Sequence, residues 1–352
     1  MQIQENVILA PYTTFKIGGP ARYFCIVKDQ FDALEAYEFA KEKKLKTFVL
    51  GGGSNLLISD EGFDGLVIKV VNKGIEVLKE DESRVLLRVA SGEVWDEVVR
   101  FAVTNNWWGI ENLSHIPGSS GAIAVQNVGA YGQEASRVIE SVTVFNKDTH
   151  QIISINNQDC KFAYRKSIFN SEEKGKYIIF NIDFNLSKIP APVLSYRDLS
   201  QKFTNSIPSL SEIRSAVIEI RNKKFPFPVE AKNGNAGSFF KNPILEGRSY
   251  QELKNKLANS FGASAVEALE KKKFEEGNVI KVPAAYLIDI CGLKELKNGG
   301  AAINKNQPLV IINHSGKATA KDVLGLAEKV KEEVYSKTGI SLFFEPELIG
   351  FN

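Results

Sequence analysis

The chain has 352 residues, of which 43% are hydrophobic and 24% charged, and its 44 basic and 42 acidic side chains leave a formal net charge of +2. That length exceeds what one ordinary hydrophobic core needs, so we expect two or three domains. The near balance of charge argues against a nucleic-acid-binding or membrane-surface protein, in which basic residues are in excess or clustered.

Cysteine and histidine are sparse. Cys25, Cys160 and Cys291 lie far apart and form no C-x-x-C pair, which indicates buried thiols in a reducing compartment. The three histidines are also dispersed, so no metal site is predicted. The N-terminus lacks the basic and apolar regions of a signal peptide, and the apolar segment 284–293 is short and contains Asp289. We therefore expect a cytoplasmic protein that spans no membrane.

The first seventy residues read as a small α/β unit. A helix is predicted over 31–43, with Phe31, Leu34 and Phe39 on or near one face. Strands are predicted over 46–50 and 66–70.

The middle of the chain reads as strands and two helices. A strand pattern covers 84–90, and the patterns over 141–146, 151–155 and 177–186 read as strands of a mostly antiparallel sheet. One helix is predicted over 93–105, packing Val94, Val98, Phe101 and Ala102, and another over 209–222, with Ile213, Val217 and Ile220 at helical spacing.

The pattern restarts after Pro226 and Pro228, which predicts a domain boundary there. The clearest element of the chain follows. Thr319 is placed to cap a helix and Gly339 to end it. Its buried stripe is predicted to be Val323, Ala327, Val330 and Val334, and a strand is predicted over 341–345.

A triple glycine, Gly51, Gly52 and Gly53, comes directly after the strand 46–50 and is followed by Ser54 and Asn55. Consecutive glycines expose backbone N–H groups in a concave nest that binds phosphate. The motif is neither G-x-G-x-x-G nor a P-loop. A simple glycine turn is the alternative, and we favour a phosphate or pyrophosphate site.

A second glycine-rich region covers 116–132. It contains two groups of residues suited to wrapping a flat, heteroatom-rich ring through backbone hydrogen bonds. The groups are Pro117, Gly118, Ser119, Ser120 and Gly121, and then Gln126, Asn127, Gly129, Ala130 and Tyr131. A bare turn at 129–132 is the alternative.

Two further segments carry charged side chains among apolar ones. Aromatic residues around Arg165, including Tyr164, are suited to holding a guanidinium that binds a carboxylate. Glu345 follows apolar residues at the end of the last predicted strand, where burial would favour the protonated acid. An exposed hairpin and a surface strand end, respectively, are the alternatives.

The segment 234–243, G-N-A-G-S-F-F-K-N-P, is the most distinctive of the chain. Its glycines permit a tight bend beside Ser238, with Lys241 and Asn242 close in sequence to hydrogen-bond a polar ligand. The alternative is a turn into a strand that buries Phe239 and Phe240.

Together these motifs resemble the UDP-N-acetylenolpyruvoylglucosamine reductase family, from T-T-F-K-I-G-G-P-A at 13–21 to E-P-E at 345–347. The segment 193–199 resembles the tyrosine loop of its longer, type I members. Ala124, where a proline is frequent, and His115, where an apolar residue is usual, are departures near the expected flavin loop.

The resemblance implies an α+β fold: a two-part FAD-binding unit of the vanillyl-alcohol-oxidase type and a smaller α+β substrate-binding domain. The expected divisions are 1–70 with the tail 346–352, then 71–223, then 224–345. It also implies non-covalent FAD, NADPH as hydride donor, and reduction of an enolpyruvyl ether of a UDP-sugar in peptidoglycan precursor synthesis. Small molecules are the expected partners of a monomer that binds no nucleic acid or membrane.

Site residues follow from the resemblance position by position. Arg165 and Glu345 would stabilise negative charge, and Ser238 would donate a proton, helped by Lys224, Lys241 or Asn242. The substrate would be bound by Tyr164, Tyr196, Lys224 and Asn242. Arg221 would bind the flavin, as would the two glycine-rich regions.

Two other functions remain open. A flavin oxidase of the same fold commonly tethers its flavin through histidine, yet no histidine stands beside 51–55, and Ser238, Arg165 and Glu345 have no role in alcohol oxidation. A non-catalytic nucleotide-sugar-binding protein would need neither glycine-rich region.

Overall fold

The computed structural model describes residues 1–204, 207–224 and 227–351. Its backbone contacts divide the chain into two compact units. The first unit comprises Met1–Val7, Pro20–Gly53 and Phe63–Phe227, and the second comprises Ile8–Gly19, Ser54–Gly62 and Pro228–Asn352. Pro226, at the predicted boundary, lies outside the described residues.

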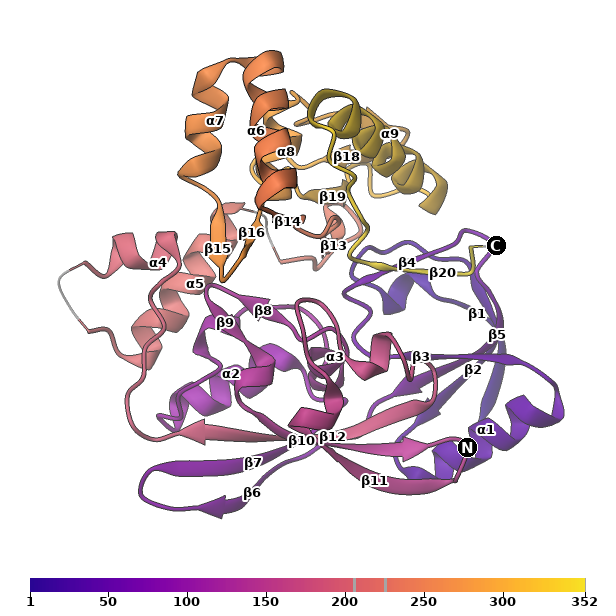
Figure 1. The fold of residues 1–352 in the computed structure, drawn as a ribbon. Helices are drawn as coiled ribbons and strands as arrows, with labels where there is room; N and C mark the ends of the chain where they lie inside the picture. The colour runs from indigo at the N-terminus through magenta and orange to yellow at the C-terminus, as the bar shows by residue number, and fades with distance from the viewer. Residues whose placement is uncertain (205–206, 225–226, 352) are drawn as a thin grey trace. The chain divides into compact units, whose positions relative to one another are not determined.

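The first unit begins with a four-stranded sheet in the order β1-β2-β5-β3, in which β2, β5 and β3 run parallel (Figure 1). The strands are β1 (Ile3–Ile8), β2 (Pro20–Val27), β3 (Lys46–Leu50) and β5 (Phe63–Val70). The connecting helix α1 (Gln30–Glu42) starts where the Asp29 side chain accepts from the Phe31 and Asp32 N–H groups. Its buried face consists of Ala33, Ala36, Tyr37 and Ala40.

The predicted face of this helix was therefore wrong for Phe31, which is 71% exposed. Phe31 occupies the first turn of α1, where Asp29 caps the backbone and the chain has just left the sheet. Leu34 and Phe39 do pack, partly buried, against the core beneath α1.

The second sheet of this unit is antiparallel, in the order β11-β10-β12-β7-β6. Its strands are β6 (Ile75–Glu80), β7 (Arg84–Ala90), β10 (Ile139–Asn146), β11 (Gln151–Asn156) and β12 (Tyr177–Ser187). These confirm the predicted strands of the middle region. The β8 (Gly129–Ala130) and β9 (Gln133–Glu134) strands form a separate short hairpin.

Helices of the first unit contribute to this core and to a separate apolar cluster around Trp108 and Tyr131. They are α2 (Trp95–Thr104), α3 (Ser120–Val125), α4 (Arg197–Lys202) and α5 (Leu210–Lys224), with short 3₁₀ helices η2 (Glu111–Leu113), η3 (Ala135–Arg137), η4 (Asn157–Cys160) and η5 (Ile168–Asn170). Trp95, Val98 and Ala102 of α2 are fully buried, whereas Val94, which precedes the helix, is 49% exposed, contrary to prediction. Phe101, also predicted to pack, is 38% exposed and meets the Trp107 ring edge to face, with ring centres 5.6 Å apart.

The second unit contains three small sheets and four helices. The β13-β19-β18-β17 sheet consists of β13 (Gly234–Ser238), β17 (Lys297–Asn298), β18 (Ala301–Ile303) and β19 (Val310–Asn313). The β14-β16-β15 sheet consists of β14 (Ile244–Glu246), β15 (Phe274–Glu276) and β16 (Val279–Lys281). A parallel pair joins β4 (Leu56–Ile58) to β20 (Glu347–Ile349), and η1 (Ala10–Tyr12) is a single 3₁₀ turn.

The four helices are α6 (Gly247–Phe261), α7 (Ala263–Glu270), α8 (Ala284–Ile290) and α9 (Ala320–Thr338). The α9 prediction is confirmed: the Thr319 side chain accepts from the Asp322 N–H, and Gly339 ends the helix with φ +72°. Its predicted stripe is fully buried, and each valine there contributes about 1.5–3 kcal/mol by leaving water.

The predicted strand over 341–345 was wrong. The only bridge there is Phe240 with Phe344, and Phe343 is 70% exposed, so no ladder extends in the described part of this segment. The β20 strand follows it and pairs with β4. This pairing explains why 54–62 and the tail belong to the second unit, although 1–70 and 346–352 were expected to form one subdomain. The finer three-part division stays a prediction.

Candidate active site

The triple-glycine loop packs directly against the start of the second glycine-rich region. The Gly52 N–H donates to Ser119 Oγ at 3.0 Å. A Cβ built on Gly52 would lie 2.4 Å from Gly118 Cα, a distance that no side chain tolerates. Gly53 has φ +66°, in the region that glycine adopts without strain. The two predicted flavin loops are thus one contact surface within the first unit, and Gly52 is required by their packing.

A buried cation that sequence reasoning missed lies beside this loop. Lys69, in β5, donates from Nζ to the Gly51 carbonyl oxygen. Burial lowers its pKa, with a further contribution from Lys73. A lysine inside the apolar run L-V-I-K-V was the signal in the sequence. The nest therefore combines glycine backbone with a half-buried ammonium, a donor set that fits the pyrophosphate of a dinucleotide.

The loop after Pro117 leads into α3. Gly118 has φ +129°, the Ser120 hydroxyl donates to the Glu93 carbonyl, and the Gly121 N–H donates to the Ser91 carbonyl. A Cβ on Gly121 would lie 2.6 Å from the Ser91 Cβ. These contacts fix the loop by backbone packing. Gln126, at the end of α3, is half-buried.

The following loop is held by its own amide side chain. Asn127 is buried and has φ +44°; its Nδ2 donates to Glu134 Oε2 and the Ala163 carbonyl, and its Oδ1 accepts from the Ser136 N–H. Its side chain therefore orders the loop and offers a ligand little further hydrogen-bonding capacity. Tyr131 also has a left-handed backbone, with φ +51°. Non-glycine residues in this region mark sites where structure overrides local preference.

Arg165 lies at the tip of a tight turn in which Ala163 and Lys166 exchange both backbone hydrogen bonds. It has φ +55°. Its Nη2 donates to the Gly129 carbonyl at 3.1 Å, and its guanidinium carbon lies 5.1 Å from the centre of the Tyr164 ring. The hairpin named as the alternative is present as this tight turn, with Arg165 half-buried in it. The turn also holds the guanidinium beside the predicted flavin loop.

A second aromatic–cation group joins the ends of this unit's last helices. The rings of Tyr131 and Tyr196 meet edge to face, with centres 5.1 Å apart. Lys224 Nζ lies 5.6 Å from the first ring centre and 5.5 Å from the second. Lys224 also pairs with Asp198 at 2.7 Å. The predicted substrate residues Tyr196 and Lys224 are therefore adjacent.

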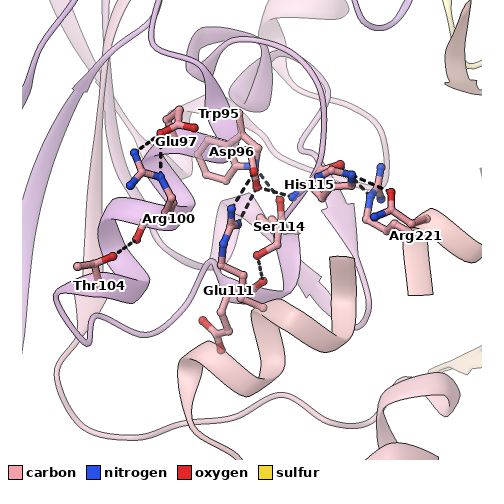
Figure 2. Close-up of polar contacts among 12 residues, drawn as sticks. Trp95, Asp96, Glu97, Arg100, Thr104, Glu111, Ser114, His115 and Arg221 are labelled. Carbon is pink, nitrogen blue, oxygen red and sulfur yellow. Dashed lines mark hydrogen bonds and ion pairs between the residues drawn. The ribbon is translucent and has the colours of Figure 1, made fainter. Parts of the chain in front are cut away.

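Arg221, predicted at the flavin, belongs to a polar network around His115 (Figure 2). Its Nε donates to the His115 carbonyl at 2.9 Å, and the His115 N–H donates to Asp96. Figure 2 shows Asp96 and Arg221 on opposite sides of His115. Burial lowers the pKa of both Arg221 and the His115 ring.

Asp96 anchors that network through a bidentate pair with Arg214 at 2.7 and 2.8 Å. Burial opposes ionisation of Asp96, but hydrogen bonds from Arg214 and the His115 backbone lower its pKa overall. His115 itself has φ +61° and its Nε2 lies 3.1 Å from Asn222 Oδ1. The residue that departs from the family pattern thus ties the segment before Pro117 to α2 and α5.

Sequence reasoning also missed two buried polar residues of η2. Asn112 Nδ2 donates to the Tyr131 and Val193 carbonyls at 2.7 and 2.8 Å, so it links the predicted flavin loop to the tyrosine loop. Glu111 is 2% exposed, accepts from the Gly109 N–H, and has a pKa raised by burial. Both stand in the G-I-E-N-L stretch, where polar residues between apolar ones were the available signal.

In the second unit, Ser238 ends β13 at an irregularity in its pairing with β19. Gly237 has φ +73°, and a Cβ there would meet no described atom within 4 Å. The Phe239 carbonyl, one residue after Ser238, accepts from the Glu345 N–H at 3.0 Å. Ser238 and Glu345 therefore lie on paired segments, over a core containing the fully buried Phe239 and Phe240. The constrained bend and the buried phenylalanines, posed as alternatives, are both present.

The other predicted site residues of this unit lie near the segments of Ser238 and Glu345. Asn55 Nδ2 donates to the Glu345 carbonyl at 3.2 Å, so the polar end of the G-G-G-S-N motif adjoins Glu345. Ser54, next to it, is half-buried. Asn242 Oδ1 accepts from the Ala284 N–H at the start of α8, which fixes the amide side chain beside the Ser238 segment of this unit.

Among the described residues, no group of three or more His, Cys, Asp or Glu side chains is arranged to hold a metal ion. No described helix combines the length and hydropathy needed to cross a membrane.

Comparison with known protein families gives two matches. Residues 21–154 match the family model described as FAD binding domain, and residues 228–349 match that described as UDP-N-acetylenolpyruvoylglucosamine reductase, C-terminal domain. These matches confirm the predicted fold class as an α+β protein with a FAD-binding unit and a further, smaller domain.

Relatives cover almost the whole chain. The UDP-N-acetylenolpyruvoylglucosamine reductase of Flavobacterium johnsoniae is 38% identical over 99% of this chain and 100% of its own, and that of Neisseria gonorrhoeae is 37% identical over 98% and 96%. The crystal structure of UDP-N-acetylenolpyruvylglucosamine reductase from Thermus caldophilus shares the fold, with a TM-score of 0.68, 24% identity and 99% coverage of both chains. On this full-length similarity, the chain belongs to the UDP-N-acetylenolpyruvoylglucosamine reductase family.

Proposed function

We propose that this protein is an NADPH-dependent flavoenzyme that reduces the enolpyruvyl ether of UDP-N-acetylglucosamine enolpyruvate to UDP-N-acetylmuramate, a step of peptidoglycan precursor synthesis. Family membership supports the reaction. The observation that carries it is the 3.0 Å hydrogen bond from the Glu345 N–H to the Phe239 carbonyl, which pairs the segments of Ser238 and Glu345. A hydroxyl and a carboxylate carried on paired segments suit protonation chemistry and have no use in alcohol oxidation.

The residues of the first unit fit FAD. Gly51, Gly52 and Gly53 offer a nest that also contains the half-buried Lys69, as a pyrophosphate requires. Further contacts are assigned to Ser54, Asn55, Arg221 and the two glycine-rich groups at 117–121 and 126–131. FAD, when bound, supplies the hydride that it has taken from NADPH. Binding is proposed to be non-covalent, because no histidine stands beside 51–55.

Arg165 is assigned to the substrate carboxylate. Addition of a hydride to the enolpyruvyl alkene leaves negative charge on the carbon next to that carboxylate. A guanidinium already held by the Gly129 carbonyl and the Tyr164 ring loses little freedom when it binds the developing charge. Tyr164 is assigned to the substrate with it.

Ser238 is assigned the proton transfer to the carbon, and Glu345 the stabilisation of the charge that precedes it. A serine hydroxyl is a weak acid, so its alkoxide must receive hydrogen bonds. Lys241 and Asn242, which follow Ser238 by three and four residues, are the donors proposed in the same unit.

The diphosphate of the UDP-sugar is assigned to Tyr196, Lys224 and Asn242. Lys224 supplies a full positive charge beside two tyrosine rings. We further propose a monomer that works in the cytoplasm and supports cell-wall synthesis, and thereby cell shape and division.

Colour and redox behaviour test the proposal. The purified protein should be yellow, release its flavin on acid precipitation, bleach with NADPH under anaerobic conditions, and regain colour with the enolpyruvyl UDP-sugar. Flavin retained in the precipitate with reoxidation only by oxygen would indicate an oxidase, and a colourless protein that binds the sugar would indicate a binding protein.

A further inference from the structure

Asp198 forms an ion pair with Lys224, the residue that the proposed function assigns to the substrate diphosphate. The two are 2.7 Å apart, Asp198 in the first turn of α4 and Lys224 at the end of α5. Their side chains are 35% and 28% exposed, so solvent and solutes reach both. The contact is therefore a partly exposed ion pair that a ligand can displace.

The position of Lys224 does not depend on Asp198 alone. Its ammonium lies within 6 Å of the centres of both the Tyr131 and Tyr196 rings, a distance at which cation–π attraction acts. Tyr131 is in turn fixed through its carbonyl, which accepts from the buried Asn112. Loss of the carboxylate would thus leave the ammonium in place but without its counter-ion.

We propose that Asp198 is an intramolecular counter-ion that an incoming diphosphate must displace from Lys224, so that Asp198 lowers the affinity for the ligand and restricts binding to groups of high negative charge. The inference rests on the assignment of Lys224 to the diphosphate. Carboxylate and phosphate oxygens compete for the same three N–H donors, and a carboxylate left beside a diphosphate repels it.

An orienting role makes the opposite prediction. If Asp198 served to aim Lys224 at the ligand, or to support the first turn of α4, its removal would weaken binding. The sign of the change in affinity therefore separates the two roles, and its size is modest because partly exposed pairs are weak.

The experiment uses the FAD-loaded protein and UDP as the probe, titrated by calorimetry. Asp198→Asn should bind UDP about 3- to 10-fold more tightly than the unsubstituted protein. Glu219→Gln is the matched control: Glu219 lies on α5, pairs with Lys202 and Lys223, and its loss changes net charge equally, so UDP affinity should stay unchanged. Flavin content and melting temperature check that both variants fold.

Lys224→Gln and the double variant complete the cycle. Lys224→Gln should weaken UDP binding at least 10-fold, and adding Asp198→Asn to it should give a smaller gain than Asp198→Asn gives alone, because only the repulsion between carboxylate and diphosphate is then relieved and no ammonium remains to be released. Unchanged or weaker binding by Asp198→Asn, while Lys224→Gln loses affinity, would overturn the counter-ion role alone. Unchanged binding by Lys224→Gln would remove Lys224 from the diphosphate site and overturn both assignments.

Discussion

The Gly52 N–H donates a hydrogen bond to Ser119 Oγ at 3.0 Å, and the two loops that carry these residues are close enough that a Cβ on Gly52 would meet the Gly118 backbone. We had expected Gly52 to be bare so that a phosphate could approach it. The structure gives a second requirement, because the triple-glycine loop must first fit against the loop after Pro117.

Gly52→Ala should therefore lower the flavin content of the purified protein to a small fraction of normal, because the added methyl group would push the two loops apart. Absorbance of the purified protein at the flavin bands measures the loss. Gly247→Ala is the control: a Cβ there meets no described atom within 4 Å, and its flavin content should be normal. Full flavin content in Gly52→Ala would show that cofactor binding tolerates separation of the loops.

Lys69→Met should separate stability from cofactor affinity. Burial lowers the Lys69 pKa, so its charged form costs free energy in the folded apoprotein, and methionine fills the space without that cost. We expect an apoprotein at least as stable to heat, with FAD affinity about 10-fold or more weaker. Thermal melts and FAD titration of the apoprotein measure both. Equal FAD affinity would exclude Lys69 from the pyrophosphate site.

Glu111→Gln should change stability in a pH-dependent way. Burial raises the Glu111 pKa above the unfolded value of about 4.3, so from that pH upward the unfolded chain loses its proton before the folded protein does, and stability falls. Glutamine resembles the protonated acid. The variant should therefore match the unsubstituted protein below about pH 4. Its free energy of unfolding should exceed that of the unsubstituted protein increasingly above this pH, until the folded protein has also lost its proton. A difference that is constant with pH would contradict the buried-acid account.

Asn112→Leu should loosen the tyrosine loop. The substitution leaves the Tyr131 and Val193 carbonyls without their donor, and each buried unsatisfied group costs about 1–3 kcal/mol. Hydrogen exchange should accelerate in 190–200, and the KM for the UDP-sugar should rise more than kcat falls. Asn105→Leu is the control, because the Asn105 amide contacts only the Phe101 carbonyl of its own exposed helix end. Exchange in 190–200 equal to that of the control would rule out the link.

The sequence was sufficient for features that repeat locally. The α9 helix has its cap, stripe and terminal glycine in one run, and the strands of the antiparallel sheet are rich in β-branched and aromatic residues, so both were predicted closely. The motifs around Ser238 and Gly51 were recognised because their residues, each common in turns, stand in unusual combinations.

Contacts between segments that are far apart in the chain could not be predicted from the sequence. The contact of Lys69 with Gly51 depends on β5 lying beside β3, and the contact of Asn112 with Val193 joins residues 81 apart. The false strand at 341–345 had three consecutive apolar residues but forms a single bridge, Phe240 with Phe344. The side-chain role of Asn127 inside its own loop likewise followed from three hydrogen bonds that no local pattern reveals.

The central assignment is Ser238 as the proton donor in substrate reduction, and stopped-flow traces of the two half-reactions of Ser238→Ala test it most directly. NADPH should reduce the flavin of the variant at a nearly normal rate, because that step needs no proton from Ser238. Reoxidation by the enolpyruvyl UDP-sugar should slow by about 10²–10⁴-fold, and Ser238→Cys, which keeps a transferable proton, should slow less. Equal slowing of both half-reactions, or of neither, would contradict the account and leave Ser238 as a turn residue above Phe239 and Phe240.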